Sequence, residues 1–288
     1  MRTANNKHKI SIIIPSFNEE NNIKNCLKSL SMHKKNIEII LVDDCSSDKT
    51  IQIAQKIGIL LKLNLKIIQL TKHRERGTAR NIGAKHSNGD YLFFIDSDMK
   101  LGNNVISECI RFIGDDNDVK ALIIPEQSVG EGFWAKCKGL EKKCYLGDNR
   151  IEAARFFEKK AFWNVGGWDS RMISGEDWDL TRRIRSKYKI GRIKSRLYHN
   201  EFKLTLWRAV KKKFYYASVS GIYLGKNPLS ILGLIFFIFR PAFIRNWKLI
   251  ASDPIHGAGM FFLKLMELFA GVAGYLFSKL PNHPQVFF

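Results

Sequence analysis

The sequence contains few cysteines, and no two of them stand at the spacing of a metal site. Its five cysteines among 288 residues occupy positions 26, 45, 109, 137 and 144, and none forms a C-x-x-C pair. The chain therefore lacks both a zinc-binding pattern and the dense disulfide framework of a small secreted domain. This cysteine usage predicts free thiols in a reducing compartment.

The sequence also shows no pattern of a secretory signal peptide near residue 1. Residues 1–9 are polar, and the first strand-like run begins at Ile10, so no apolar core of a signal peptide precedes it. Internal repeats and low-complexity segments are absent as well. We therefore expect an ordinary globular chain whose catalytic part lies in the cytoplasm, with one large domain and a smaller appendage.

Acidic residues are scarce in one part of the chain. Residues 181–250 contain 17 Lys and Arg against a single acid, Glu201, and the whole chain carries a formal charge of +20. Such an asymmetric basic block indicates an anionic partner. Because no signature of a nucleic-acid-binding fold is present, we do not expect nucleic acid. Anionic phospholipid or a lipid-linked phosphate is the alternative that we favour.

The most informative positive feature is an apolar run that ends in two carboxylates. Residues 91–98 read YLFFIDSD, in which five apolar residues predict a buried strand. Asp96 and Asp98 would then lie at the carboxyl end of the strand, where open α/β sheets bind ligands. Oxygen ligands favour Mg²⁺ or Mn²⁺, and substrate phosphates usually complete the shell of such an ion. The pair predicts a metal-bound diphosphate, although the same short motif, taken alone, is typical of a solvated turn.

Strand-like and helix-like segments alternate through the first 125 residues. Apolar runs at residues 10–14, 37–42 and 65–70 predict strands, and helix patterns follow at residues 23–30, from about 49, and at 77–87. This alternation predicts a mostly parallel sheet with helices on both faces, and polar clusters that converge at one edge. The glycine-containing residues 125–149, in contrast, suggest a mobile loop.

Six short segments share the order and spacing of one enzyme family. They are residues 12–20 (IIIPSFNEE), 41–50 (LVDDCSSDKT), 77–84 (GTARNIGA), 96–98 (DSD), 166–169 (GGWD) and 175–179 (GEDWD). Together they resemble the inverting glycosyltransferases of family 2. The resemblance implies the Rossmann-like GT-A fold over residues 1–203, followed by a helical membrane-associating region over residues 204–288.

The resemblance implies where a nucleotide sugar, the donor substrate, would bind. In the family the corresponding residues line the nucleotide pocket, here Pro15, Phe17 and Glu19, while Asp44 with Asp43 faces the base. A carboxylate suits this position because it accepts the imide N–H of uracil or the amino group of guanine. The plainer alternative, which applies more to Asp43 than to Asp44, is that they form a turn and cap a helix.

Further matched positions concern the diphosphate and the ion. The resemblance places Arg80 beside the diphosphate, where a guanidinium fits phosphate geometry. It places Mg²⁺ or Mn²⁺ on Asp98 with Asp96, and in some relatives a histidine near the position of His199 completes the metal or diphosphate site. A surface arginine and a structural histidine are the plainer alternatives for Arg80 and His199.

Asp177 matches the catalytic base of the family, which takes the proton of an acceptor hydroxyl. Its plainer alternative is an acidic residue in the first turn of a helix, and Asp179 fits that description better. The processive synthases of the family carry Gln-x-x-Arg-Trp after the base. Here only Trp207 and Arg208 occur, in the opposite order and without the glutamine. We therefore expect one sugar to be transferred in each encounter.

The C-terminal region combines apolar, aromatic and basic residues. Residues 229–239 are apolar but too short for an ordinary spanning helix, and residues 260–277 are apolar except for Lys264 and Glu267, which are spaced to pair. Basic and aromatic residues surround both runs. The pattern predicts an anchor on an anionic membrane surface. A soluble helical subdomain or oligomer interface, and a shallow hairpin that spans the bilayer, are the alternatives.

The resulting hypothesis is an enzyme that moves one sugar from a UDP- or GDP-sugar to a lipid-linked saccharide, with inversion, at the cytoplasmic face of the cell membrane. Direct transfer to polyprenyl or dolichyl phosphate is one alternative. A non-catalytic membrane-bound scaffold and a nucleotidyltransferase are others, of which the latter lacks the expected glycine-rich phosphate loop. The sequence leaves the sugar, the base and the oligomeric state open.

Overall fold

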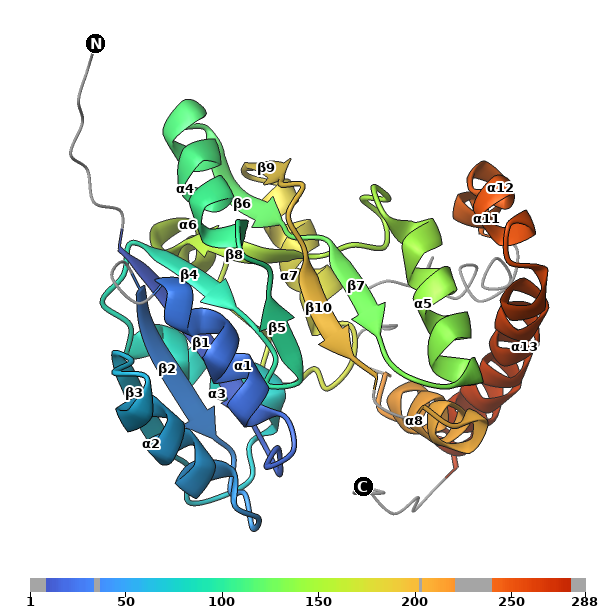
Figure 1. Cartoon of the computed structure of the whole chain (residues 1–288), viewed down its shortest axis with the longest axis horizontal. Coiled ribbons are helices and arrows are strands. Elements are labelled where there is room, and N and C mark those ends of the chain that lie inside the picture. Colours follow the sequence, from blue (N-terminus) through green and yellow to red (C-terminus); the bar gives the residue numbers. More distant parts are fainter. Residues whose placement is uncertain (1–8, 34–36, 202–203, 221–239, 281–288) are drawn as a thin grey trace. The chain divides into compact units, whose positions relative to one another are not determined.

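The computed structural model describes residues 9–33, 37–201, 204–220 and 240–280 (Figure 1). The chain forms two compact units, each assembled from separated segments. The first unit contains Met1–Pro125, Ala153–Ser170 and Asp177–His199, and the second contains Glu126–Glu152, Arg171–Glu176 and Asn200–Phe288. The apolar run predicted at residues 229–239 lies outside the described residues.

A seven-stranded sheet forms the centre of the first unit. Its strand order is β3-β2-β1-β4-β8-β6-β9. The strands are β1 (Ile10–Ser16), β2 (Ile37–Asp43), β3 (Leu65–Gln69), β4 (Tyr91–Phe94), β6 (Val119–Ile123), β8 (Ala154–Glu158) and β9 (Lys189–Arg192). Neighbouring pairs among β1 to β4 are parallel, whereas β8 runs antiparallel to both β4 and β6. The predicted α/β fold with a mostly parallel sheet is confirmed.

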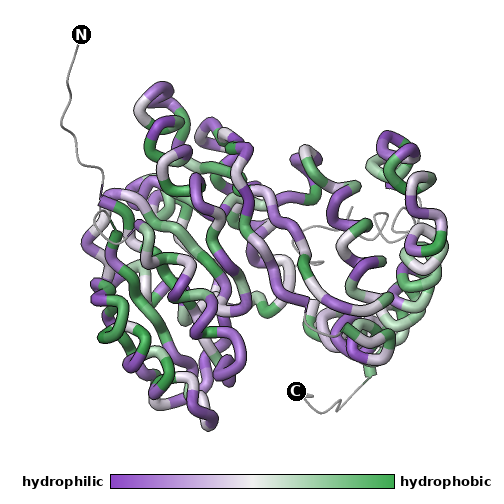
Figure 2. Tube along the Cα trace, viewed as in Figure 1, coloured by the Kyte–Doolittle hydropathy of each residue, from purple (hydrophilic) through white to green (hydrophobic). Residues whose placement is uncertain are grey.

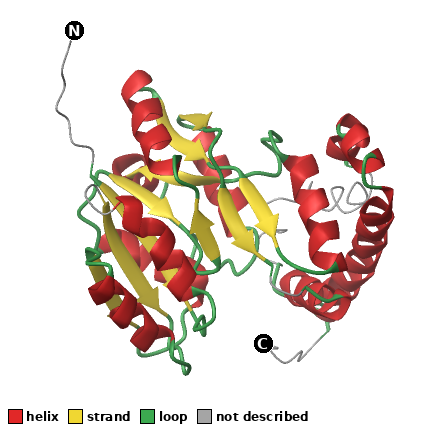
Figure 3. Cartoon of the chain, viewed as in Figure 1, coloured by secondary structure: helices red, strands yellow, loops and turns green. Residues whose placement is uncertain are grey.

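Helices cover both faces of this sheet (Figure 3). Successive side chains of a strand point to opposite faces, so each strand contributes to two cores. Ile12 and Ile14 of β1 pack in one core with α1, α2 and α4, whereas Ile13 belongs to the opposite core with α3, α6 and α7. These helices are α1 (Ile23–Leu30), α2 (Thr50–Leu60), α3 (Glu75–Lys85), α4 (Val105–Asp115), α6 (Lys159–Asn164) and α7 (Glu176–Arg185). Burial on both faces explains why β1 and β2 read as continuous apolar runs.

A short antiparallel pairing brings together two distant parts of the first unit. Strand β5 (Met99–Leu101) pairs with β10 (Leu197–Asn200), and Met99 stands opposite His199. His199 therefore lies next to the end of the Asp-Ser-Asp segment, although about a hundred residues separate them in the chain. Sequence separation alone gave no reason to expect this contact.

The second unit is mainly helical, and it corrects one expectation. Residues 125–149 are not a loop, because they form β7 (Glu126–Val129) and α5 (Phe133–Tyr145). Glycines are typical of loops, but Gly139 lies inside α5. A Cβ at this position would stand 3.5 Å from the carbonyl oxygen of Ser128, so α5 packs closely on β7 there. The remaining described helices are α8 (Leu206–Ser218), α11 (Pro241–Arg245), α12 (Trp247–Ala251) and α13 (Pro254–Phe277).

Buried ion pairs hold α13 against α5 in the second unit. Glu141 of α5 accepts a hydrogen bond from Lys264 of α13, at 2.8 Å, and another from Lys138, also at 2.8 Å. Lys138 also bonds to Glu267 of α13 at 2.8 Å. The predicted pairing of Lys264 with Glu267 is present at 3.8 Å. These charges compensate one another inside the helix packing, as buried charges must.

The close packing of α3 on the sheet gives a test of this fold. A Cβ at Gly83 would lie 2.5 Å from Cγ2 of Ile13, whereas a Cβ at Gly114 in α4 meets no atom within 4 Å. We expect Gly83→Ala to lower the free energy of unfolding by about 1–3 kcal/mol through overpacking. Gly114→Ala should raise it by up to about 1 kcal/mol, because alanine favours the helix. Urea denaturation measures both, and equal midpoints for the two variants would contradict the packing.

Candidate active site

The carboxyl ends of β1, β2 and β4 form one edge of the sheet, as parallel strands require. Ser16 stands opposite Asp43 in the register of β1 and β2, and the backbone N–H of Asp44 donates to the carbonyl of Ser16 at 2.8 Å. Beyond β4, the backbone N–H of Ile95 donates to the carbonyl of Ile13 at 3.1 Å. The polar segments that follow these strands therefore begin side by side.

Asp43 and Asp44 differ in their surroundings although both are buried. The carboxylate of Asp43 accepts hydrogen bonds from the hydroxyls of Ser16, at 3.1 Å, and Ser46, at 2.6 Å. These bonds hold the turn after β2. The carboxylate of Asp44 instead accepts the backbone N–H of Arg74 at 2.7 Å and lies 3.0 Å from Nδ1 of His73. Asp44 therefore joins the end of β2 to the loop that leads into α3.

An aromatic contact lies beside Asp44. The ring of Phe17, which is 42% exposed, lies with its centroid 4.7 Å from that of His73. Pro15 is buried within β1, opposite Val42 of β2. Phe17 and His73 thus place two partly exposed rings, tilted by 46° to each other, near a buried carboxylate, whereas Pro15 belongs to the strand.

Asp96 is bound by two arginines from different elements. Nη2 of Arg80 in α3 lies 2.5 Å from one carboxylate oxygen, and Nη1 of Arg155 in β8 lies 3.3 Å from the other. Burial alone would raise the pKa of Asp96, but Arg80 and Arg155, with Arg76 nearby, hold it well below its usual value. Asp96 is therefore an ionised carboxylate whose charge the protein itself compensates.

Asp98, two residues later, has a different environment. Its Oδ2 lies 2.9 Å from Nε2 of His199, which the pairing of β5 with β10 brings beside it. Its Oδ1 is buried and makes no hydrogen bond among the residues that the structure describes. A buried carboxylate oxygen without a partner is a costly arrangement unless a ligand satisfies it. A carboxylate and an imidazole side by side are also a donor set that divalent ions accept.

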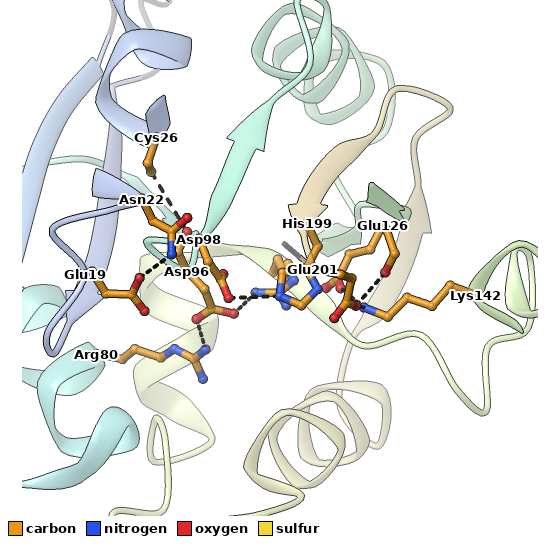
Figure 4. A network of polar contacts seen from close by, with 12 residues as sticks. Glu19, Asn22, Cys26, Arg80, Asp96, Asp98, Glu126, Lys142, His199 and Glu201 are labelled. Carbon is orange, nitrogen blue, oxygen red and sulfur yellow. Dashed lines mark hydrogen bonds and ion pairs between the residues drawn. The ribbon is translucent and has the colours of Figure 1, made fainter. Parts of the chain in front are cut away.

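Glu19 adds a third carboxylate near this pair. In Figure 4, Glu19, Asp96 and Asp98 lie near one another, with Arg80 and His199 as their neighbours. Burial raises the pKa of Glu19, and the negative charges of Asp98 and Asp96 raise it further. The carboxyl group of Glu19 therefore gives up its proton less readily than an exposed glutamate does.

Asp177 is connected to the same region by hydrogen bonds. It stands half-buried in the first turn of α7, and its carbonyl accepts the hydroxyl of Thr181 at 2.7 Å. The oxygen of Thr181 in turn accepts the backbone N–H of Ala154 at 3.0 Å. Ala154 precedes Arg155, which binds Asp96, so two hydrogen bonds link the turn of Asp177 to the strand that contacts the acids.

Asp179 has the structural role that we expected of it. Its buried carboxylate binds Arg182 at 3.1 Å and Arg183 at 2.8 Å within the same helix. Trp178, between the two acids, is 40% exposed. Asp179 therefore belongs to an ion-pair network, whereas Asp177 lies half-buried in the first turn of the helix.

The segment 166–169 contacts Arg80, the α3 arginine that binds Asp96. The side-chain amide of Asn81 donates to the carbonyl of Trp168 at 2.7 Å and accepts its backbone N–H at 3.0 Å. The guanidinium of Arg80 lies over the ring of Trp168, 4.6 Å from its centroid. Gly167 has φ +64°, and a Cβ there would lie 2.9 Å from the amide oxygen of Asn81. The glycine allows this close approach.

Two residues of the site were not singled out from the sequence. Arg155 stands in the otherwise largely apolar run ARFFE of β8, and an arginine in such a run was a detectable signal of a buried charge with a partner. His73 lies in the basic loop before α3 and gave no signal, because its contact with Asp44 depends on how the loop folds back.

Several characterised proteins resemble the chain. The "Poly(ribitol-phosphate) beta-N-acetylglucosaminyltransferase TarS" of Staphylococcus aureus is 36% identical over 125 residues, which cover 42% of this chain and 21% of TarS. The "Dolichol-phosphate mannosyltransferase" of Pyrococcus furiosus is 32% identical over 113 residues, which cover 38% of this chain and 32% of that protein. The matched segments thus span a third or less of these relatives.

Solved structures share the fold. TarS residues 1–349 in complex with UDP-GlcNAc superpose with a TM-score of 0.57 at 20% identity, over 94% of this chain and 90% of that one. The mannosyltransferase PcManGT from Pyrobaculum calidifontis, in complex with GDP-Man and Mn²⁺, gives a TM-score of 0.63 at 14% identity, over 94% and 88% of the two chains. The family model "Glycosyl transferase family 2" matches residues 11–169, more than half of the chain. The protein therefore belongs to glycosyl transferase family 2.

Proposed function

We propose that the protein transfers one sugar from a nucleoside-diphosphate sugar to a lipid-linked saccharide, with inversion of the anomeric carbon, at the cytoplasmic face of a membrane. The observation that carries the proposal is the pair of unlike carboxylates after β4. Asp96 is ionised and balanced by two arginines, whereas Asp98, beside His199, keeps a buried oxygen that has no hydrogen-bond partner among the described residues. A diphosphate with its divalent ion suits such an edge.

The proposed donor pocket lies along the edge formed by β1 and β2. Asp44 would accept the N–H groups of the base, and Phe17 with His73 would pack against its ring. The bond from the N–H of Arg74 to Asp44 fixes the carboxylate in place. Glu19, near Asp98, and Asp43, which holds the turn, would shape the pocket, with Pro15 beneath them. UDP-GlcNAc and GDP-Man in the similar structures favour a pyrimidine or purine diphosphate sugar as donor.

The residues present fit a divalent ion that the substrate helps to hold. Asp98 and His199 would supply protein ligands, and the unpartnered oxygen of Asp98 would gain a bond. Among the described residues, no three His, Cys, Asp or Glu side chains could hold an ion together. Diphosphate oxygens and water would therefore complete the shell of Mn²⁺ or Mg²⁺. When bound, the ion would neutralise charge on the leaving nucleoside diphosphate.

Arg80 would act on the donor through Asp96. Its guanidinium is buried, bonded to Asp96 and stacked on Trp168. We therefore propose that Arg80 and Arg155 keep Asp96 ionised and correctly oriented, and that Asp96 contacts the nucleotide sugar or the shell of its ion. This assigns Arg80 a positioning role, in place of the direct phosphate contact that the resemblance suggested.

Asp177 would be the catalytic base. In the displacement, an acceptor hydroxyl attacks the anomeric carbon from the side opposite the diphosphate, its proton passes to the carboxylate of Asp177, and the bond between carbon and diphosphate oxygen breaks. The first turn of α7 favours an ionised carboxylate, which is the form that a base requires. The exposed face of Trp178 would support the acceptor sugar.

The acceptor has a second candidate. If the acceptor is a polyprenyl or dolichyl phosphate, the nucleophile is already ionised near neutral pH, since the second pKa of a phosphate is about 6. The Pyrococcus furiosus relative, a dolichol-phosphate mannosyltransferase, favours this candidate by its name. Asp177 and the polymer-modifying TarS favour a saccharide or polymer hydroxyl. A non-catalytic scaffold is the least favoured, since it has no use for a base.

The shared metal site predicts cooperation between ion and nucleotide. We expect Mn²⁺ to bind at least about tenfold more tightly in the presence of UDP or GDP, because a site with two protein ligands is incomplete without phosphate oxygens. Asp98→Asn should remove this gain, whereas Asp115→Asn on the surface of α4 should keep it. Isothermal titration calorimetry measures the affinities, and equal Mn²⁺ affinity with and without either nucleotide would refute the shared site.

The unlike surroundings of the two acids predict unlike effects on stability. Asp96→Asn leaves Arg80 and Arg155 without the carboxylate that balances them and should lower the free energy of unfolding by about 3 kcal/mol. Asp98→Asn is the matched control, because it removes charge from the neighbouring acid and relieves repulsion with Glu19. Its unfolding free energy should be equal to or above that of the wild type. Urea denaturation separates the two, and similar losses would contradict the proposed division of roles.

The variant Asp177→Asn distinguishes a saccharide acceptor from a polyprenyl-phosphate acceptor. With a saccharide acceptor, loss of a general base should lower kcat by about 10²- to 10⁴-fold while donor binding stays unchanged. With polyprenyl phosphate, turnover should remain near that of the wild type. Release of nucleoside diphosphate is measured with UDP- and GDP-sugars and each acceptor, with Asp115→Asn as control. Absence of acceptor-dependent release from the wild type with every donor would reject the transferase and favour the scaffold.

A further inference from the structure

Helix α13 of the second unit has an unusual distribution of side chains. Lys264 and Glu267 are the Lys, Arg, Asp or Glu residues of α13, and both are buried, at 1% and 5% exposure. Every exposed residue of α13 is apolar or proline. The large ones are Ile255, Phe262, Leu265, Phe269, Val272 and Leu276, whose exposures range from 39% to 70%. A helix on the surface of a water-soluble unit normally shows the opposite arrangement.

The exposed residues form one continuous stripe. Together with exposed Ala258, they recur at alternating steps of three and four residues from Ile255 to Leu276, which places them within an arc of about 100° on one side of the helix. The stripe is about 32 Å long at the rise of an α-helix. Figure 2 shows α13 in green to white along most of its length. Contiguous apolar surface of this size marks a site of interaction.

Buried contacts fix which side of α13 faces outward. Lys264 and Glu267 bond to Glu141 and Lys138 of α5, each at 2.8 Å. On the same inner side, a Cβ at Gly274 would lie 2.2 Å from the carbonyl oxygen of Phe214 in α8. Rotating the helix to hide its apolar stripe would expose two separated ion pairs and break this close packing. The stripe is therefore a stable outward feature of the second unit.

We propose that the apolar stripe of α13 lies in the plane of a membrane and inserts into the region between the headgroups and the acyl chains. The proposal rests on the membrane location proposed above, but it does not depend on the transfer reaction. The helix would dock by one face only, as an interfacial helix does, with its ion-paired face turned to the rest of the second unit.

The chemistry around the stripe favours lipid over a protein partner. Interfaces between proteins in water have a polar rim around an apolar centre. The residues that flank this stripe on α13 are uncharged, and they include Phe261, Met266 and Leu268. Helices α8, α11 and α12 of the same unit contain basic residues and no Asp or Glu, and Arg208, Lys211, Lys212 and Lys248 are exposed. Such a unit suits a surface of anionic headgroups.

The same charges argue against a transmembrane orientation of α13. By length and composition this helix could cross a bilayer. However, it packs along α5 and α8, which expose Lys136, Lys143, Lys211 and Lys212. A spanning α13 would draw these ammonium groups into hydrocarbon, which is strongly unfavourable. An in-plane helix leaves them in water or at the headgroups.

Flotation of the full-length protein with vesicles tests the proposal. The variant Phe269→Glu/Leu276→Glu places two charges on the stripe, and Ile59→Glu/Leu60→Glu on α2 is the matched control, since those residues are 81% and 67% exposed in the first unit. With phosphatidylcholine vesicles that contain phosphatidylglycerol, we expect the wild type and the control to float. The stripe variant should bind at least about tenfold less. Binding should weaken with salt and with phosphatidylcholine alone.

Three results would overturn the proposal. The first is flotation of the stripe variant equal to that of the wild type, or no flotation of the wild type. The second is a lipid-free dimer that becomes monomeric in the stripe variant, as measured by light scattering, which would assign the stripe to a second copy of the chain. The third is retention of the protein on vesicles after an alkaline carbonate wash, which would indicate a spanning helix. Nucleotide binding by the same samples reports separately on the first unit, so failure of docking and failure of the transferase are distinguishable.

Discussion

The balance of charge at Asp96 is the interaction on which the rest of the site depends. A carboxylate at the end of a buried strand is stable in its ionised form only if the protein supplies compensating charge. Arg80 from α3 and Arg155 from β8 supply it at 2.5 and 3.3 Å. Arg80 is itself held by Trp168, and Trp168 by two hydrogen bonds to Asn81. These two ion pairs thus join a helix, two strands and a turn at the edge of the sheet.

This balance also makes two nearby acids chemically different. Asp96 has its partners within the protein, whereas Asp98 has one oxygen near His199 and another without a partner in the described part of the chain. Two carboxylates at nearly the same place in the sequence can therefore serve different purposes, because their environments differ more than their positions. Asp96 also ties the elements of the site together through its arginines, whereas Asp98 has an oxygen that no described residue satisfies.

Local patterns predicted the strands and helices of the first unit well, because strands buried on both faces read as continuous apolar runs, as in β1 and β2. The partners of the acids were harder to predict, since Arg155 is 59 residues from Asp96 and His199 is 101 residues from Asp98. The resemblance to a family indicated His199, but the only local sign of Arg155 was an arginine in a largely apolar strand.

The helices of the second unit were harder to predict. Helix α5 was not predicted, because glycines are typical of loops. The pairing of Lys264 with Glu267 was predicted from spacing, but their partners on α5 were not, and those partners decide which face of α13 points outward.

The position of His199 in the chain joins the candidate ligand site to the pairing of β5 with β10. His199 is the last residue of the first unit, and Asn200 begins the segment that leads into the helices of the second. Any ligand that bonds to the imidazole also restrains the residue from which this segment departs, because the pairing of Met99 with His199 then becomes harder to open. Occupancy of the imidazole and the stability of this strand pairing are thus thermodynamically linked. A ligand at His199 would hold β10 more firmly against β5, and with it the point at which the chain leaves the first unit.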